Sequence, residues 1–337
     1  MRRLPVYFLL DVSESMVGEP IAQVEEGLRT IIQDLRKDPY ALETVFVAVL
    51  AFAGQAHILS SLEELYNFNP PKLFIGDGTA LGLGLETLMR DLDNSVQKTT
   101  LEVKGDWKPI IFLFTDGVPT DNPKQAINKW VKKYRTKANM VAISLGDADT
   151  KILGQLTENV FRLKETTRET FQSFFKWVTA SVKTSSMSVA DTGQDELKLA
   201  PYSINLEKVD PNEPTKVDER TLVLLAKCSK TGQAYLQKYQ HDLEQDTYDP
   251  IGAYPLDLSQ YEKFSGQKPS NKRINVQKLT AIPPCPHCGN DNGFINCGRC
   301  QKLSCGYTEG NIFKCPWCGH SGRVSYDDSF DISRERG

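Results

Sequence analysis

The chain lacks cysteine in its first 227 residues, and it lacks any apolar run of the length that crosses a membrane. A membrane-spanning helix needs about 20 consecutive apolar residues, so we do not expect one. Cysteines confined to one end are not typical of a secreted disulfide scaffold. The basic and then apolar start has the composition of a short signal peptide, but we interpret residues 4–10 as a strand that ends at Asp11. These observations predict a cytoplasmic protein.

Motifs for nucleotide binding and nucleophilic catalysis are absent as well. The sequence holds no G-x-x-x-x-G-K-[ST] phosphate loop and no G-x-G-x-x-G after a strand. None of the four histidines (His57, His241, His287 and His320) stands in a motif with a serine or cysteine nucleophile. The net charge of −3 argues against broad affinity of the whole chain for nucleic acid. We therefore do not expect an enzyme.

What the sequence does contain is a regular alternation of strands and helices. Its 337 residues suggest two domains, and 40% hydrophobic with 25% charged residues is typical of a folded globular protein. Amphipathic helical patterns separate the apolar, strand-like runs. This alternation predicts a mostly parallel α/β sheet with helices on both faces. The runs are residues 6–10, 45–52, 110–114, 140–145 and 160–163.

Polar side chains follow two of these runs, and another lies in a turn that opens a helix. A D-x-S-x-S motif follows the first strand, Thr79 lies in a Gly-rich turn before a helix, and Asp116 ends the strand that begins at Ile110. In open α/β sheets, ligands bind outside the carboxyl ends of the strands. Mg²⁺ prefers oxygen ligands and takes only one or two protein carboxylates. The pattern therefore predicts a Mg²⁺ or Mn²⁺ site with one position open to an outside ligand.

These three segments resemble the metal-ion-dependent adhesion site of von Willebrand factor A domains. The resemblance implies a Rossmann-like, doubly wound sheet and a cation bound at the ends of its strands. Glu14 departs from the family pattern, which more often has glycine there, and Asp77 adds a second charge near Thr79. These charges either raise the cation affinity or repel the carboxylate of a partner. The ligands that the resemblance implies are Asp11, Ser13, Ser15, Thr79 and Asp116.

Seven of the eight cysteines lie close together near the end of the chain. Cys285 with Cys288 and Cys315 with Cys318 form two nearly identical C-P-x-C-G turns. Such paired thiols are typical of structural Zn²⁺ sites with tetrahedral geometry. The segment is too short to fold by apolar burial alone, so we expect the ion to supply folding energy. The predicted Zn²⁺ ligands are Cys285, Cys288, Cys297, Cys300, Cys305, Cys315 and Cys318.

The number and pairing of the zinc sites stay open at this point. Two tetrahedral sites need eight ligands, and His320 or His287 could supply the eighth. The first C-P-x-C turn pairs either with the last one or with other cysteines, in which case Cys297 and Cys300 pair with the last turn. We interpret Cys228, which is distant in sequence, as a small buried thiol.

Changes in composition divide the chain into four parts. Residues 240–280 look irregular and rich in turn formers. We expect a von Willebrand A domain over residues 1–185 and an acidic linker with three prolines over 186–219. A small β-rich domain of the zinc-ribbon type follows over 220–326, beginning with a hairpin of residues 221–228 and 233–239, and 327–337 form a loose tail.

The whole chain resembles the TerY-like family of bacterial tellurium-resistance and stress systems. The resemblance is carried by residues 4–11, 38–44, 105–112 and 115–121, and by the Cys228-Ser-Lys-Thr-Gly segment before the cysteine-rich end. It implies a cytoplasmic scaffold that works beside a protein kinase and a PP2C-type phosphatase.

We therefore favour a metal-dependent protein-binding adaptor that recognises a partner carboxylate through Mg²⁺. One alternative is a nucleic-acid-associated module, because the zinc-binding half is mildly basic and a loose patch surrounds Tyr261 and Phe264. The other alternative is a metal-dependent hydrolase that uses Asp11 and Asp116. The lysines and arginine of the loose patch are Lys268, Lys272, Arg273 and Lys278.

Overall fold

The computed structural model describes residues 2–145, 149–163, 167–192, 197–201, 206–209, 221–266, 273–308, 310–325 and 329–333. The chain divides into two units. The first comprises Met1–Val12, Glu19–Leu73 and Thr79–Val217. The second comprises Asp218–Gly337 together with two short segments, Ser13–Gly18 and Phe74–Gly78.

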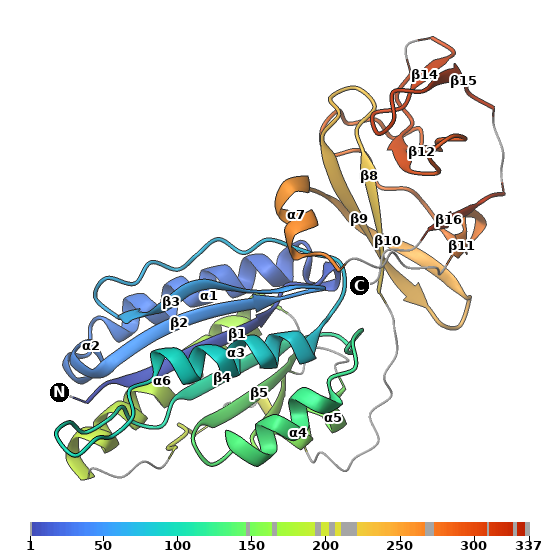
Figure 1. The fold of residues 1–337 in the computed structure, drawn as a ribbon. Coiled ribbons are helices and arrows are strands. Elements are labelled where there is room, and N and C mark those ends of the chain that lie inside the picture. The colour runs from blue at the N-terminus through green and yellow to red at the C-terminus, as the bar shows by residue number, and fades with distance from the viewer. Residues whose placement is uncertain are drawn as a thin grey trace. The chain divides into compact units, whose positions relative to one another are not determined.

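A seven-stranded sheet forms the centre of the first unit (Figure 1). Its strand order is β3-β2-β1-β4-β5-β6-β7. The five strands from β2 to β6 in this order pair in parallel, whereas β3 and β7 pair antiparallel at the two edges. The mostly parallel sheet predicted from the sequence is therefore confirmed. The strands are β1 (Leu4–Asp11), β2 (Val45–Phe52), β3 (Ala56–Glu64), β4 (Ile110–Thr115), β5 (Asn139–Leu145), β6 (Val160–Leu163) and β7 (Leu206–Lys208).

Helices cover both faces of this sheet (Figure 1). Because successive side chains of a strand point to opposite faces, Tyr7 and Leu9 pack under α3, α4 and α5, while Phe8 lies on the other side. There Phe114 meets Phe174 of α6 edge to face, with ring centroids 5.4 Å apart. No helix among the described residues is long and apolar enough to span a membrane. The helices are α1 (Glu19–Leu35), α2 (Pro39–Thr44), α3 (Leu81–Ser95), α4 (Lys124–Lys133), α5 (Thr150–Leu156) and α6 (Arg168–Thr192).

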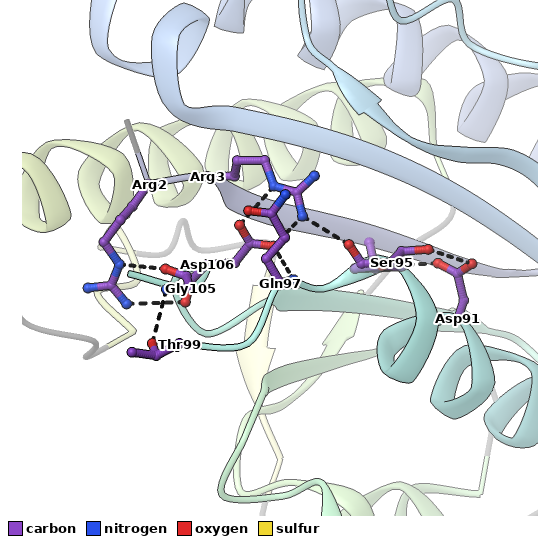
Figure 2. Close-up of polar contacts among 9 residues, drawn as sticks. Arg2, Arg3, Asp91, Ser95, Gln97, Thr99, Gly105 and Asp106 are labelled. Carbon is purple, nitrogen blue, oxygen red and sulfur yellow. Dashed lines mark hydrogen bonds and ion pairs between the residues drawn. The ribbon is translucent and has the colours of Figure 1, made fainter. Parts of the chain in front are cut away.

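A polar network ties the loop before β4 to the start of β1 (Figure 2). Arg3 forms a two-point ion pair with Asp106, with Nε–Oδ1 and Nη2–Oδ2 distances of 2.8 and 2.5 Å. The Asp106 side chain is only 1% exposed and also accepts the amide of Gln97 at 2.8 Å. Arg3 donates a further bond to the carbonyl of Ser95 at 2.9 Å. Such additional bonds make the burial of an ion pair tolerable, so this network fixes the amino-terminal ends of β1 and β4.

The acidic linker predicted over 186–219 is partly regular structure where the chain is described. Helix α6 continues to Thr192, and β7 adds an antiparallel edge strand to β6. Leu206 and Val209 are 3 and 5% exposed, so two apolar side chains attach this polar segment to the sheet. Residues 193–196, 202–205 and 210–219 of the predicted linker lie outside the described residues.

A five-stranded sheet of order β10-β9-β8-β13-β12 forms the centre of the second unit. Its β8 and β9 form the predicted antiparallel hairpin. Strand β13 then joins β8 in parallel, although the two are far apart in sequence. Two small two-stranded sheets, β11–β16 and β14–β15, complete the unit. The bounds are β8 (Thr221–Lys227), β9 (Ala234–Asp242), β10 (Thr247–Pro255), β11 (Arg273–Asn275), β12 (Phe294–Asn296), β13 (Leu303–Cys305), β14 (Ile312–Lys314), β15 (Ser321–Arg323) and β16 (Asp331–Ser333).

Two predictions for the second unit were wrong. Residues 240–280 are not irregular, because they contain β10 and helix α7 (Leu258–Phe264). Pro250 and Gly252 are unusual in a strand, so the sequence pattern of β10 does not resemble one. Strand β10 lies at the edge of its sheet, where proline is tolerated, and its pairing with β9 shifts register between these two residues. The tail is not loose throughout, because β16 pairs with β11 and buries Ile332 to 1% exposure.

We expect Asp106→Ala to lower the free energy of unfolding of the first unit by about 3 kcal/mol, because Arg3 would lose its partner in a largely desolvated site. Urea denaturation followed by far-UV circular dichroism measures this change. The control is Asp34→Ala, which removes an exposed ion pair with Lys37 and should change stability by less than about 0.5 kcal/mol. Equal losses in the two variants would contradict a stabilising role for the buried network.

Candidate functional site

Two of the predicted cation ligands lie at one edge of the first unit's sheet. Asp11 is the last residue of β1 and Asp116 follows the last residue of β4, the parallel neighbour of β1. The Asp11 side chain is 2% exposed, and the hydroxyl of Thr115 donates to its Oδ2 at 2.6 Å. The Thr115 oxygen in turn accepts the amide of Gly117 at 3.3 Å. These bonds orient the Asp11 carboxylate and link it to the loop that carries Asp116.

Thr79 meets the same loop from the turn before α3. Its amide donates to the hydroxyl of Thr120 at 2.9 Å, and the amide of Thr120 donates back to its carbonyl at 2.9 Å. A Cβ added at Gly117 would lie 3.1 Å from Thr79 Oγ1. This hydroxyl is buried and has no hydrogen-bond partner among the described residues. Burying a hydroxyl without a partner is unfavourable, and a cation would supply the missing interaction.

Ser13 and Ser15 belong to the segment Ser13–Gly18, which is grouped with the second unit. Ser13 forms an isolated parallel bridge with Gly76, and Ser15 lies in the short 3-10 turn Glu14–Met16. Their side chains are 0 and 9% exposed, and the two hydroxyl oxygens are 3.0 Å apart. The segment therefore presents two neighbouring hydroxyls, two and four residues after Asp11.

The two additional acidic residues near the motif are buried rather than displayed to solvent. Glu14 is fully buried and accepts a hydrogen bond from the Tyr261 hydroxyl. Asp77 is 6% exposed, and its amide donates to the hydroxyl of Ser265 at 2.9 Å. The Glu14 carboxylate is thus engaged inside the second unit, which gives it a role other than meeting a partner's carboxylate.

Asp121 is a contributor that the sequence analysis missed. Its Oδ2 accepts the amide of Leu83 at 3.2 Å, and a Cβ added at Gly82 would lie 2.6 Å from the same oxygen. Burial raises the pKa of Asp121, although the bonds from these backbone amides lower it in part. Asp121 thereby holds the first turn of α3, which begins two residues after Thr79. This contact could not be predicted, because Leu83 and Asp121 lie 38 residues apart in the sequence.

The second unit contains two groups of four cysteines. Within each group the sulfur atoms lie within 4.8 Å of one another, the distance at which they can share one metal ion. Four thiolates in tetrahedral contact are typical of structural Zn²⁺. The first group is Cys228, Cys285, Cys288 and Cys305, and the second is Cys297, Cys300, Cys315 and Cys318.

These groups correct the interpretation of Cys228 and of the histidines. Cys228 is not an isolated thiol, because parallel pairing of β8 with β13 places its sulfur 3.9 Å from that of Cys305. His320 lies outside both groups, and His287 Nε2 instead contacts the carbonyl of Ala234 at 2.9 Å. The total of eight cysteines, two complete sets of four, was the signal that could have identified Cys228.

The cysteine pairing follows the alternative in which Cys297 and Cys300 join the last C-P-x-C turn. The hairpin of β12 and β13 connects the groups. Its turn carries Cys297 and Cys300 of the second group, and its second strand ends at Cys305 of the first. The indole of Trp317 donates to the carbonyl of Leu303 at 2.7 Å, a further link between the last turn and β13. Each group therefore depends on the placement of one shared hairpin.

Burial opposes ionisation of the thiols in both groups. Burial raises the pKa of the Cys285 and Cys315 thiols to about 12. Burial also opposes ionisation of Cys228, but hydrogen bonds from Thr231 and from the Lys230 amide outweigh it and lower the pKa of Cys228 to about 6. A metal ion displaces thiol protons and neutralises the converging charge.

Together, the parallel sheet, the strand-end oxygens and the thiol groups define a metal-binding α/β protein with a second, cysteine-rich unit. The family model described as von Willebrand factor type A domain matches residues 6–176, more than half of the 337 residues, so the chain belongs to this family. The model described as TerY-C metal binding domain matches residues 218–337. This combination is that of a TerY-like protein, as the resemblance predicted.

Several solved structures are similar to this chain. The pilus adhesin SpaC from Lactobacillus rhamnosus GG is 12% identical, with 54% of this chain and 31% of that chain covered and a TM-score of 0.45. A von Willebrand factor type A protein from Catenulispora acidiphila is 14% identical, with coverages of 76 and 66% and a TM-score of 0.40. Proximal thread matrix protein 1 from the mussel byssus, with a zinc-occupied MIDAS motif, is 18% identical, with coverages of 55 and 46% and a TM-score of 0.38. The chain thus spans less than a third of SpaC, and similarity at this level carries no information on function.

We expect Cys228→Ser to lower the zinc content of the full chain from two ions to one, because the first group would keep only three thiolates. Elemental analysis of purified protein measures this. His320→Ala is the matched control and should retain both ions. The assignment fails if the histidine variant loses an ion and the cysteine variant does not.

Proposed function

We propose that this chain is a protein-binding adaptor whose von Willebrand A unit recognises partners through a divalent cation. The observation that carries the proposal is the buried Thr79 hydroxyl, which has no hydrogen-bond partner among the described residues and lies against the loop of Asp116. The bond from Thr115 to Asp11 brings a carboxylate to the same loop. An oxygen-rich set with two carboxylates fits Mg²⁺ or Mn²⁺.

The chain's own residues prepare this site for binding. Asp11 and Asp116 would supply charge, and Thr79, Ser13 and Ser15 would supply hydroxyl oxygens. When bound, the cation supplies a Lewis acid that can accept a carboxylate from a partner. The hydrogen bond from Thr115 keeps the Asp11 carboxylate oriented before the cation binds. The entropy cost of ordering this side chain on binding is therefore small. Burial of Asp11 excludes water and makes a charge interaction there stronger than a surface ion pair.

Binding, rather than catalysis, is the chemistry that we propose. All eight cysteines lie in the two thiol groups, which leaves none as a nucleophile. His241 stacks on Tyr248 with ring centroids 4.4 Å apart and contacts Asp246, while His287 contacts a backbone carbonyl. A hydroxyl-rich set that leaves one position open suits a ligand from a partner better than an activated water.

We propose that the second unit holds two structural Zn²⁺ ions and makes contacts that need no free Mg²⁺. The TerY-like resemblance supports a protein kinase and a PP2C-type phosphatase as partners. A cytoplasmic location is part of the proposal, because clustered metal-binding thiols persist in a reducing compartment. The nucleic-acid alternative loses support, because Tyr261 and Phe264 are 5 and 1% exposed, and Lys268 and Lys272 lie outside the described residues.

We expect Asp11→Asn to weaken Mn²⁺ binding by about 100-fold, equivalent to about 2.7 kcal/mol, because the variant loses one of two carboxylate charges. The amide oxygen can still accept the bond from Thr115, so the fold should persist. Calorimetric titration of the full chain measures affinity, and capture of proteins from a native lysate with Mg²⁺ or EDTA measures partner binding. Thr30→Ala, on the exposed side of α1, is the control. Unchanged affinity and capture in the Asp11 variant would refute the adaptor mechanism.

A further inference from the structure

The two cysteine groups of the second unit differ in their exposure to solvent. In the first group, three thiols are at most 2% exposed and the fourth, Cys288, is partly buried. In the second group, two are 2% exposed, Cys300 is partly buried and Cys318 is exposed. A reactant dissolved in water therefore meets the second group at Cys318, and no cysteine of the first group is as open.

Exposure matters here because a cysteine that binds Zn²⁺ is held as the thiolate. The thiolate, and not the thiol, is the form that reacts with peroxides. Susceptibility to oxidation rises with thiolate character and with solvent exposure. A zinc ligand that faces solvent is therefore oxidised more readily than the same ligand inside a core, and Cys318 is such a ligand.

A second thiol lies within reach of Cys318. Its sulfur is 3.8 Å from that of Cys297, which belongs to the other C-x-x-C turn of the group. Since the sulfur atoms of a disulfide are about 2.05 Å apart, an approach of about 1.8 Å closes the bond. Cys297 can thus convert a first oxidation of Cys318 into a disulfide.

Little apolar burial holds the second group in place. Among the described residues, its core cluster has three buried members, Cys297, Phe313 and Cys315, and two of these are cysteines of the group itself. The cluster around the first group has twelve, drawn largely from β8, β9 and β13. Where so little core exists, the free energy of metal binding is the free energy of folding. Loss of the second ion should therefore unfold the segment around β14 and β15 and leave the five-stranded sheet folded.

We propose that the second cysteine group is an oxidation site for peroxides of the type ROOH, whereas the first group is a protected structural site. This inference rests on the part of the proposed function that gives the unit two zinc ions. It goes beyond that part by assigning the two sites different roles. The modification is stoichiometric, and it involves no turnover of a substrate.

The reaction has two steps. The Cys318 thiolate attacks a peroxide oxygen, the O–O bond breaks, and the leaving oxygen takes a proton from solvent, which leaves a sulfenic acid on Cys318. The Cys297 thiolate then attacks this sulfur, and the hydroxide that leaves takes a second proton and becomes water. The two thiolates lose two electrons in total, and one peroxide gains them. Cys300 and Cys315, left as the two remaining thiols, no longer hold an ion.

Trp317, in the last C-P-x-C turn, can report on this change. Its indole donates to the carbonyl of Leu303 at 2.7 Å, and its ring centroid lies 4.3 and 4.5 Å from the ammonium groups of Lys227 and Lys302. It is the single tryptophan between residues 218 and 337, and the other three are at most 8% exposed. Unfolding of the turn would remove these contacts, so the fluorescence of Trp317 should change.

The test treats the full, zinc-loaded chain with hydrogen peroxide. A chromogenic chelator measures zinc release, and mass spectrometry after denaturation with an alkylating reagent identifies the oxidised cysteines. We expect one of the two ions to leave, a disulfide between Cys297 and Cys318, free thiols throughout the first group and a change in tryptophan emission. Dithiothreitol with added zinc should reverse all four changes.

Two matched variants test the role of Cys318. Cys318→His keeps a fourth ligand of a kind that Zn²⁺ accepts but removes the exposed thiolate, so zinc release should slow by about tenfold or more. Cys288→His makes the same replacement at the partly buried cysteine of the first group, and it should release the ion of the second group at the parental rate.

The outcomes separate this inference from the proposed zinc sites. If the parent chain holds two ions and peroxide releases none, releases both at one rate, or oxidises the first group first, the oxidation site is overturned while the structural sites stand. Equal rates in Cys318→His and the parent chain overturn it as well. Should Cys318→His purify with one ion, the disulfide map of the parent chain decides, and a disulfide without Cys318 refutes the proposal. If the untreated chain holds no zinc, both proposals fail.

Discussion

The parallel pairing of β1 with β4 is the constraint on which the candidate adhesion site depends. The ladder runs from Val6 opposite Ile110 to Leu10 opposite Phe114, so Asp11 and Thr115 end their strands side by side. A shift of one residue would turn every side chain of β1 to the other face of the sheet. It would bury the wrong apolar groups and break the bond between Thr115 and Asp11 together.

The pairing of β1 with β4 is secured by an ion pair at one end and by a hydrogen bond at the other. At the amino-terminal end, the buried ion pair of Arg3 and Asp106 joins β1 to the loop before β4. At the carboxyl end, the Thr115 hydroxyl joins the strands through Asp11. The first contact stabilises, whereas the second also orients a proposed ligand. In the second unit, parallel pairing of β8 with β13 plays the same part by bringing Cys228 to Cys305.

Much of this architecture could be predicted because the signals are local. Buried parallel strands are continuous apolar runs, and a ligand motif directly follows each strand that carries it, so the sheet and the position of Asp11 could be read along the chain. Strand β10 was missed because Pro250 and Gly252 contradict the usual strand pattern, and only its edge position permits them.

Features that depend on contacts between distant segments could not be predicted. Cys228 becomes a candidate ligand because β8 pairs with β13, which brings it next to Cys305, 77 residues further along the chain. No rule of cysteine spacing links two residues that are so far apart. Glu14 was interpreted as charge near the ion, but its partner is Tyr261, 247 residues away. In each case the residue type was noticed, and its role depended on a partner that only the folded chain brings near.

Anomalous diffraction from crystals of the full chain soaked in Mn²⁺ tests the central claim most directly. The account predicts one manganese peak bordered by Asp11, Thr79 and Asp116, with the hydroxyls of Ser13 and Ser15 in its coordination shell. Peaks at the zinc absorption edge in the two cysteine groups would serve as an internal control. Clear zinc peaks with no manganese at the ends of β1 and β4, or with manganese bound only elsewhere, would contradict the account.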